Sequence, residues 1–424
     1  KKRAKPSAAV ISDKEADDMS KKEKKLNNQV EEAVCLDIPE EDIWTYQIEG
    51  LAAPRINVTP KHYNLKKIIF ALVIVVAVTV SCIFSVLTLR KDTFEYEQTQ
   101  SGYMFKRFSN TGFITELDID YVLEVEYEMG NPDPKTNFKV VRDETKPVTE
   151  VGSYVLNCDE KVQVITIGAG VEKVDPKAFY SCWALREIRV DENNPNYCDV
   201  DGVLYNKDKT VLICRPCDHD TYLAEKYGYA EYDNNNWRIE PSQDDPRYEQ
   251  YVRDVLTYVV PSTVTTIGEM SFNYSNMVNV YLPEGLKTIE TLGFFEIPNL
   301  KNIYSYKTAS AVADTHFTSE EALGEVYLSL PEGLEYIGSD AFSYNREMNY
   351  VYIPGSVKYI GHHAFWDTVY KEDGELKGVS VINVAVSEDA FESSAEIGPN
   401  WRPQYDYLLF KKSVDVVYSA ERNK

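Results

Sequence analysis

The sequence predicts an α+β repeat solenoid whose short strands form one curved sheet, preceded by a single transmembrane helix and a largely disordered N-terminal tail. Three observations lead to this prediction. The segments Leu330–Asn345 and Ile353–Thr368 are nearly the same sixteen residues written twice. The run Ile68–Leu89 holds 22 residues without a charge. Residues 1–65 mix 11 basic with 12 acidic residues and have few apolar ones before Leu36.

The tail, residues 1–65, is predicted to be cytoplasmic and mostly disordered, because such mixed-charge sequence buries too little apolar surface to fold. One part differs in composition. Residues 36–51 contain Ile43, Trp44 and Tyr46 among acidic residues. Two interpretations stay open for this part: it docks on a cytoplasmic partner, or it lies as an amphipathic patch on the membrane surface.

Residues 66–91 are predicted to be a transmembrane helix with basic flanks. A helix of 22 residues is about 33 Å long, which spans a hydrocarbon core of about 30 Å. A buried core helix is the alternative, but uncharged runs of this length are rare in soluble folds. More basic residues precede the span than directly follow it, which favours a cytoplasmic N-terminus. The prediction is a single-pass protein of the cell membrane with an extracellular C-terminal part.

The C-terminal part, residues 92–424, is strongly acidic. It carries 30 basic and 56 acidic residues, a net charge of −26. Phosphate groups would be repelled by such a surface, so we expect no nucleic-acid partner.

Five copies of a repeat align on a phenylalanine. The residue eleven positions earlier is Pro or Gly, and apolar residues follow it at intervals of three. The anchors are Phe179, Phe272, Phe294, Phe342 and Phe365; the Pro/Gly positions are Gly168, Pro261, Pro283, Pro331 and Pro354; the first apolar column is Val171, Val264, Leu286, Leu334 and Val357; and the second is Val174, Ile267, Ile289, Ile337 and Ile360.

Phe272 and Phe294 are 22 residues apart, and Phe342 and Phe365 are 23 apart, which is a leucine-rich repeat period. The residues before each Pro keep L-x-x-L-x-L spacing, as Met277, Val280 and Leu282 do. Each unit is predicted to supply one short strand, a turn at the Pro and a return segment whose Phe fills the layer below. A single unit cannot bury its own apolar edge, so the units must stack.

The pattern resembles the BspA-type leucine-rich repeats, whose mark is IPxSVTxIGxxAFxxC. Cys182 stands where that family often has Cys, and Asn194–Ile213 is similar to its inserted hairpin. Glu290 and Asp175 depart from the usual Gly. The resemblance covers residues 138–393, interrupted by predicted insertions at about 199–252 and 306–322. It implies a surface protein, of a kind found on bacteria and some mucosal protists, that binds matrix proteins or other cells.

The flanks of the solenoid are predicted to shield its ends. Residues 92–137 contain an alternating stretch followed by a Pro-rich turn, which predicts strand structure and an N-terminal cap. Residues 394–424 are predicted to form the C-terminal cap.

The strand positions that alternate with the last apolar residues are predicted to point off the open sheet face. In the later repeats they place five tyrosines and two asparagines on one contiguous face. Tyrosine offers flat apolar area and a hydroxyl at low entropic cost, which suits protein or glycan contact. Strand propensity alone is the alternative explanation. The predicted binding residues are Asn279, Tyr281, Asn302, Tyr304, Tyr327, Tyr350 and Tyr352.

No catalytic, cofactor-binding or metal-binding residues are predicted, and we expect no enzymatic activity. Cys214 and Cys217 form C-x-x-C, with His219 and Cys198 nearby, but a second ligand pair at zinc spacing is missing. A disulfide is the favoured alternative outside the cell. The adjacent His362 and His363 are assigned to the surface.

The sequence therefore predicts a membrane-anchored surface protein for adhesion or recognition, which binds an extracellular protein or glycan. A transmembrane sensor that reports binding to a cytoplasmic partner through the tail is the alternative.

Overall fold

The computed structural model of the chain describes residues 93–109, 114–127, 138–156, 158–235, 238–307, 323–372, 375–379, 381–405, 412–413 and 415–423. The predicted tail 1–65 and the predicted span Ile68–Leu89 lie outside these residues. Within the described ranges, no helix is long and apolar enough to cross a bilayer.

Each layer of the repeat region supplies two strands, not one. The first set consists of two-residue strands that directly precede the turns: β15 (Thr266–Ile267), β17 (Thr288–Ile289), β20 (Tyr336–Ile337), β22 (Tyr359–Ile360) and β26 (Glu396–Ile397). They pair in parallel in this order. The sheet continues through β11 (Val211–Cys214), β10 (Val203–Asn206) and β9 (Tyr197–Val200), and it has eight strands in all.

The L-x-x-L-x-L strands form the second set, and this set is divided into three sheets. They are β3 (Glu116–Ile119), β6 (Val164–Ile167) and β8 (Glu187–Val190); β14 (Thr257–Val259), β16 (Asn279–Pro283), β18 (Asn302–Lys307) and β19 (Glu325–Tyr327); and β21 (Val351–Ile353), β25 (Val381–Val384) and β29 (Asp415–Tyr418). The prediction of one curved sheet is therefore wrong. One break is visible at β19, which pairs with β18 antiparallel, whereas β14, β16 and β18 pair in parallel.

The anchor phenylalanines form a column inside the stack, as the repeat predicts. The Phe272 and Phe294 ring centroids are 4.7 Å apart with the planes 8° from parallel. The contact repeats from Phe294 to Phe342 at 5.2 Å and from Phe342 to Phe365 at 5.1 Å. All four rings are fully buried, and Trp401 meets the last one edge-on. Phe179 is also buried, but in a separate core with Cys182 and Ile165.

The hairpin β9–β10 separates these two cores. Val203 and Tyr205 lie in the core of the phenylalanine column, and Leu204 between them lies in the smaller core. Successive strand residues point to opposite faces, so one strand can contribute to both cores. Within the predicted insertion at 199–252, β10 and β11 belong to the eight-stranded sheet.

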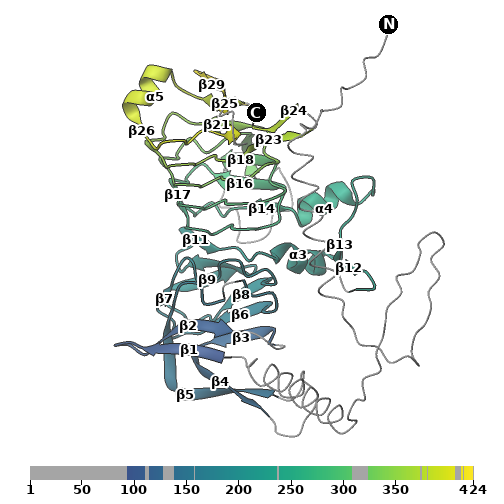
Figure 1. Ribbon diagram of the computed structural model, residues 1–424, viewed down its shortest axis with the longest axis vertical. Helices are drawn as coiled ribbons and strands as arrows, with labels where there is room; N and C mark the ends of the chain where they lie inside the picture. Colours follow the sequence, from purple (N-terminus) through teal and green to yellow (C-terminus); the bar gives the residue numbers. More distant parts are fainter. Residues whose placement is uncertain are drawn as a thin grey trace, which may run out of the picture. The chain divides into compact units, whose positions relative to one another are not determined.

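The remaining excursion contains α3 (His219–Tyr227), β12 (Glu231–Tyr232), β13 (Arg238–Ile239) and α4 (Tyr248–Asp254). Figure 1 shows α4 beside β14 and α3 next to α4. The two helices bury a small core of their own, which includes Leu223, Tyr251 and Val255.

The segment predicted as an N-terminal cap packs on the first repeats. It comprises β1 (Thr93–Gln98), β2 (Tyr103–Ser109) and β4 (Tyr121–Tyr127), which join the long β5 (Phe138–Val151) and β7 (Lys173–Val174). Phe105 and Phe108 are buried in the same core as Ile165. This segment also supplies β3, which pairs with β6 as the first solenoid strand.

At the other end, α5 (Glu388–Ser394) and Trp401 cover the column, and Phe391 packs against Trp401. Two hairpins complete the described elements: β23 (Val369–Glu372) with β24 (Glu375–Gly378), and β27 (Gln404–Tyr405) with β28 (Lys412–Ser413).

Glycine allows successive layers to approach closely at the turns. A Cβ on Gly361 would lie 2.3 Å from the Ser339 amide nitrogen. A Cβ on Gly338 would lie 2.4 Å from the Thr291 amide nitrogen. Because real Cβ atoms do not approach backbone this closely, a larger residue would force the layers apart.

The phenylalanine column provides a direct test of the fold. Phe294→Ala should lower the free energy of unfolding by about 3–5 kcal/mol, because it leaves a cavity between two stacked rings. Phe295→Ala is the matched control. Its ring is half-exposed at the turn, so the expected cost is about 1 kcal/mol. Equal losses in chemical denaturation would contradict the column as the main contact between layers.

Candidate functional site

The structure brings four of the predicted binding residues together on β16 and β18. Asn279 lies opposite Asn302, and Tyr281 opposite Tyr304. The Asn302 amide donates to Asn279 Oδ1 at 2.8 Å, and the Asn279 amide donates to Thr257 Oγ1 at 3.2 Å. The two tyrosine rings stack with centroids 4.8 Å apart. Each asparagine amide is thus engaged by the neighbouring layer.

The expectation of one open, contiguous face is wrong in two respects. Tyr327 lies on the antiparallel β19, and Tyr350 and Tyr352 lie at the separate sheet of β21. Tyr281 and Tyr352 keep only 7% and 4% of their surface exposed. Tyr281 is buried because Tyr306 and Leu323 pack with it in a small cluster. That these seven residues bind a partner remains a prediction, and the exposed area for it is small.

The C-terminus covers part of the same region. The Arg422 guanidinium lies over the Tyr327 ring, 3.9 Å from its centroid. Its Nε donates to Ser329 Oγ at 2.8 Å, and its Nη2 contacts Glu284 and Ser305. The Leu328 amide donates to the Asn423 carbonyl at 3.1 Å. Ser305, which interrupts the apolar strand pattern, thus serves as an acceptor for a residue far along the chain.

A second aromatic surface runs along the turns. We call it the turn-edge row, and it comprises Tyr154, Tyr180, Trp183, Tyr274, Phe295 and Tyr344. Neighbouring rings touch without a gap: Tyr154–Tyr180 at 5.7 Å, Tyr180–Tyr274 at 6.0 Å, Trp183–Tyr274 at 4.3 Å, Tyr274–Phe295 at 6.1 Å and Phe295–Tyr344 at 5.4 Å between centroids. Most pairs are tilted or edge-to-face, an arrangement that aromatic quadrupoles favour.

Three members of the turn-edge row have a left-handed backbone. The φ angles are +56° at Tyr154, +55° at Tyr274 and +64° at Tyr344. This conformation is strained for a bulky residue and easy for Asn or Asp. Asp340 and Asp367 adopt it at other turns of the same stack. The fold accepts Asp at such turns, so tyrosine is not required there by the backbone.

The surroundings of the row are acidic. Glu296 is adjacent to Tyr274, and burial together with hydrogen bonds to Tyr180 and Glu296 raises the Tyr274 pKa. Lys177 forms an ion pair with Glu269, with Nζ 3.0 Å from Oε1. The row therefore places aromatic rings beside the acidic side chains of Glu296 and Glu269, whereas Arg346 next to Tyr344 pairs with Asp367.

Sequence reasoning missed this surface although a signal exists. Every anchor phenylalanine is followed within two residues by another aromatic residue: Tyr180, Tyr274, Phe295, Tyr344 and Trp366. The strand pattern instead led to the prediction of binding residues on the sheet face. Only the stacked turns show that these second aromatics meet each other.

The C-x-x-C segment has a structural role. Cys214 and Cys217 are thiols with no disulfide between them. Cys217 Sγ donates to the Asn273 carbonyl at 3.4 Å, and His219 Nδ1 lies 2.9 Å from the Arg186 carbonyl oxygen. Burial raises the pKa of Cys217 to about 12. A protonated, buried thiol is a poor nucleophile and a poor metal ligand.

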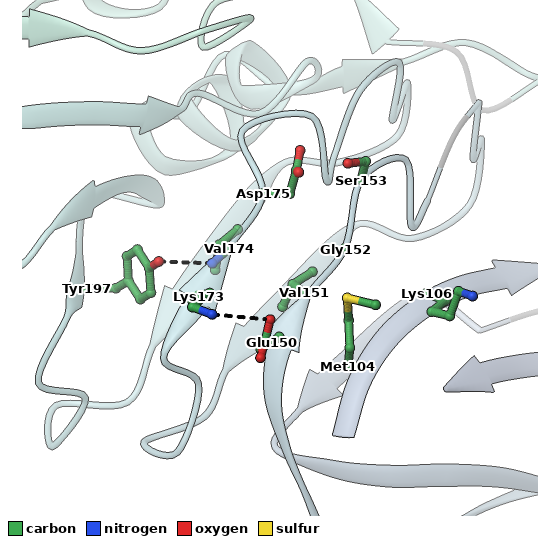
Figure 2. A pocket seen from close by; sticks show the side chains of 10 residues that line it. All are labelled: Met104, Lys106, Glu150, Val151, Gly152, Ser153, Lys173, Val174, Asp175 and Tyr197. Atoms are coloured by element: carbon green, nitrogen blue, oxygen red, sulfur yellow. Dashed lines mark hydrogen bonds and ion pairs between the residues drawn. The ribbon is translucent and has the colours of Figure 1, made fainter. Parts of the chain in front are cut away.

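A hollow of about 470 Å³ lies where β2, β5 and β7 meet. Figure 2 shows its two internal contacts. Lys173 Nζ lies 3.6 Å from Glu150 Oε2, and the Val174 amide donates to the Tyr197 hydroxyl at 2.9 Å. Neither His nor Cys is among the residues that line it. These contacts join the N-terminal strands to the first repeats.

Comparison with known proteins gives one family match. Residues 137–199 and 250–371 match the family model of the BspA type leucine rich repeat region, in six copies. No curated protein matches the chain.

Solved bacterial structures show distant similarity. A leucine-rich repeat protein from Eubacterium ventriosum is 15% identical, with a TM-score of 0.37 over 63% of this chain and 66% of that chain. One from Bacteroides ovatus is 12% identical, with a TM-score of 0.30 over 74% and 70%. A leucine rich cell surface protein from Faecalibacterium prausnitzii is 13% identical, with a TM-score of 0.25 over 78% and 96%.

The contact of Arg422 with the sheet can be tested directly. The Arg422 and Glu284 side chains are only 15% and 19% exposed, so Arg422→Gln should cost about 1–3 kcal/mol of unfolding free energy. It should also speed hydrogen exchange at the Leu328 amide. Lys358→Gln is the control, because its pair with Glu335 is exposed and worth less than about 1 kcal/mol. Unchanged exchange at Leu328 would show that the contact does not hold the C-terminus.

Proposed function

The chain carries a BspA-type leucine-rich repeat region, and from this premise we propose that it is a cell-surface recognition protein that binds a protein partner through the turn-edge row. Repeats of this kind are typically interaction scaffolds, because stacking produces an extended binding surface. A glycan is the alternative ligand class, and the test below separates it.

The exposure of the row is the observation that supports this proposal most. Among the described residues, the exposed large hydrophobic side chains are Tyr154, Trp183, Tyr232, Ile239, Tyr344 and Val417. Three of these six belong to the turn-edge row. Contiguous exposed aromatic area is unusual on a protein that has no partner, and Tyr and Trp are the side chains most enriched at interfaces.

The backbone at the row gives independent support. Left-handed tyrosines cost folding free energy that Asn or Asp would not cost at the same turns. Tyr154 and Tyr344 combine this backbone with an exposed ring, whereas Tyr274 is half-buried. An exposed ring at a turn where Asn or Asp would cost less is consistent with a binding role for these two residues.

The acidic charge of residues 92–424 favours one class of partner. Residues 92–424 carry a net charge of −26, and Glu296 lies beside the row. Complementarity favours a partner with a basic surface, and association should slow as salt increases. The predicted sheet-face residues with exposed area, such as Tyr304, are proposed as a secondary contact.

The proposed location is the cell surface, with anchoring by residues 68–89 and the repeats outside. The support is the uncharged run of 22 residues and the basic residues that precede it. In this arrangement the turn-edge row would be available to extracellular proteins.

The proposal can be tested with cells that display the full chain, probed against arrays of extracellular proteins and glycans. The triple variant Tyr154→Asn, Trp183→Ser, Tyr344→Asn should weaken binding to its protein partner by at least about tenfold, because it removes the exposed rings. Because Asn suits a left-handed turn, the unfolding free energy of the triple variant should differ from that of the unaltered chain by only about 1 kcal/mol.

The matched control is Tyr232→Ser with Ile239→Ser, which removes equally exposed apolar side chains from the hairpin β12–β13. It should bind like the unaltered chain. Unchanged binding by the triple variant would refute the row as the contact surface. Binding to glycans and to no protein would refute the proposal that the partner is a protein.

A further inference from the structure

Asp340, His362 and His363 form a cluster of metal-ligating side chains on two successive turns. Each can offer one ligand atom, and these atoms lie within 4.8 Å of one another. The two imidazole rings are 3.5 Å apart between centroids. His363 Nδ1 lies 3.8 Å from Asp340 Oδ1. Asp340 and His363 are 23 positions apart in the sequence. They meet because the repeat stacks their turns in register.

The spacing is close to what a bound ion needs. Bonds of about 2.0–2.2 Å from a metal to nitrogen and oxygen place neighbouring ligand atoms about 3–4 Å apart. Small side-chain rotations would therefore bring the three atoms onto one ion.

The backbone of the two turns is held in place. The φ angles are +53° at Asp340 and +56° at His363, and the Asp340 amide donates to the His362 carbonyl at 2.9 Å. Gly361, just before the histidines, packs against the preceding layer with no space for a Cβ. A rigid frame lowers the entropic cost of gathering ligands.

A second set of contacts orients the ligands. The Ser343 hydroxyl lies 2.9 Å from Asp340 Oδ1 and 2.8 Å from the His363 carbonyl oxygen, so it can donate to either. The Trp366 ring packs on His363 at 4.4 Å between centroids. Such outer contacts fix the ligand orientation at protein metal sites. The side chains of His363 and Asp340 are 27% and 32% exposed, so an ion can reach them from solvent.

We propose that Asp340, His362 and His363 bind one divalent transition-metal ion, of the class of Zn²⁺, Ni²⁺ or Co²⁺. Two imidazole nitrogens and one carboxylate oxygen suit these ions, whereas Ca²⁺ and Mg²⁺ take oxygen ligands. Three protein ligands leave at least one coordination position, which faces solvent. The site is independent of the proposed partner surface, since the row does not include these residues.

The test is calorimetric titration of the full chain, purified without a polyhistidine tag, with Zn²⁺, Ni²⁺ and Ca²⁺ in turn. We expect one Zn²⁺ or Ni²⁺ per chain, reversed by a chelator, and no saturable Ca²⁺ binding at these residues. His363→Asn and Asp340→Asn keep side chains that accept a left-handed backbone, so both variants should fold. Each, and His362→Gln, should weaken binding by more than about tenfold, since even outer-contact changes cost 10–100-fold.

Two controls make the result specific. Asp367→Asn alters a left-handed turn aspartate that pairs with Arg346, and it should leave affinity unchanged. His62→Gln with His316→Gln removes histidines elsewhere in the sequence and should do the same. With Co²⁺, the visible absorption spectrum should report nitrogen ligation that is lost in His363→Asn.

Absence of Zn²⁺ and Ni²⁺ binding would overturn the proposal. So would binding whose affinity and stoichiometry are the same in all three ligand variants. A loss of affinity in His62→Gln with His316→Gln that equals the loss in the ligand variants would place the ion elsewhere and overturn it as well.

Discussion

The structure depends on the stacking of one phenylalanine per layer. A short turn cannot bury a phenyl ring alone, so each ring needs the ring of the next layer above it. Between Phe272 and Phe365 the spacing stays between 4.7 and 5.2 Å, which is also the separation of paired strands. The two-residue strands before the turns follow the same spacing and pair continuously. The column thus fixes the turns of the layers from Phe272 to Phe365.

Because the turns are fixed, the side chains at the edge of the turns also have fixed neighbours in the next layer. Tyr180, Tyr274, Phe295 and Tyr344 lie one or two positions after an anchor, and the rings of successive members meet across layers. The same register places Asp340 beside His363. Aromatic recognition and metal binding, as proposed, are both consequences of stacking and require no separate scaffold. The opposite face is different, because Arg422 and the reversed β19 convert part of it into internal packing.

The anchors, the proline turns and the two apolar columns could be predicted from sequence because they repeat: Leu286, Ile289 and Phe294 recur in kind in each copy and are buried. The division of these strands into three sheets could not be predicted from the repeat, and one of its two breaks depends on the reversal at β19. Arg422 reaches Glu284 across 138 residues, and no local pattern signals such a contact. The burial of Tyr281 depends on Tyr306, outside the repeat pattern. Binding residues were sought on strands, so the exposed rings of the turns were missed.

Hydrogen exchange of the anchor amides tests the stack most directly. The amides of Phe272, Phe294, Phe342 and Phe365 each donate to a carbonyl of the next layer, that of Gly293, Ala341, Ala364 or Trp401 respectively. If the column joins the layers into one cooperative unit, all four amides should exchange through one opening, with free energies within about 1 kcal/mol of each other. Four clearly different free energies, falling layer by layer toward one end, would show that the layers open independently and would contradict this account.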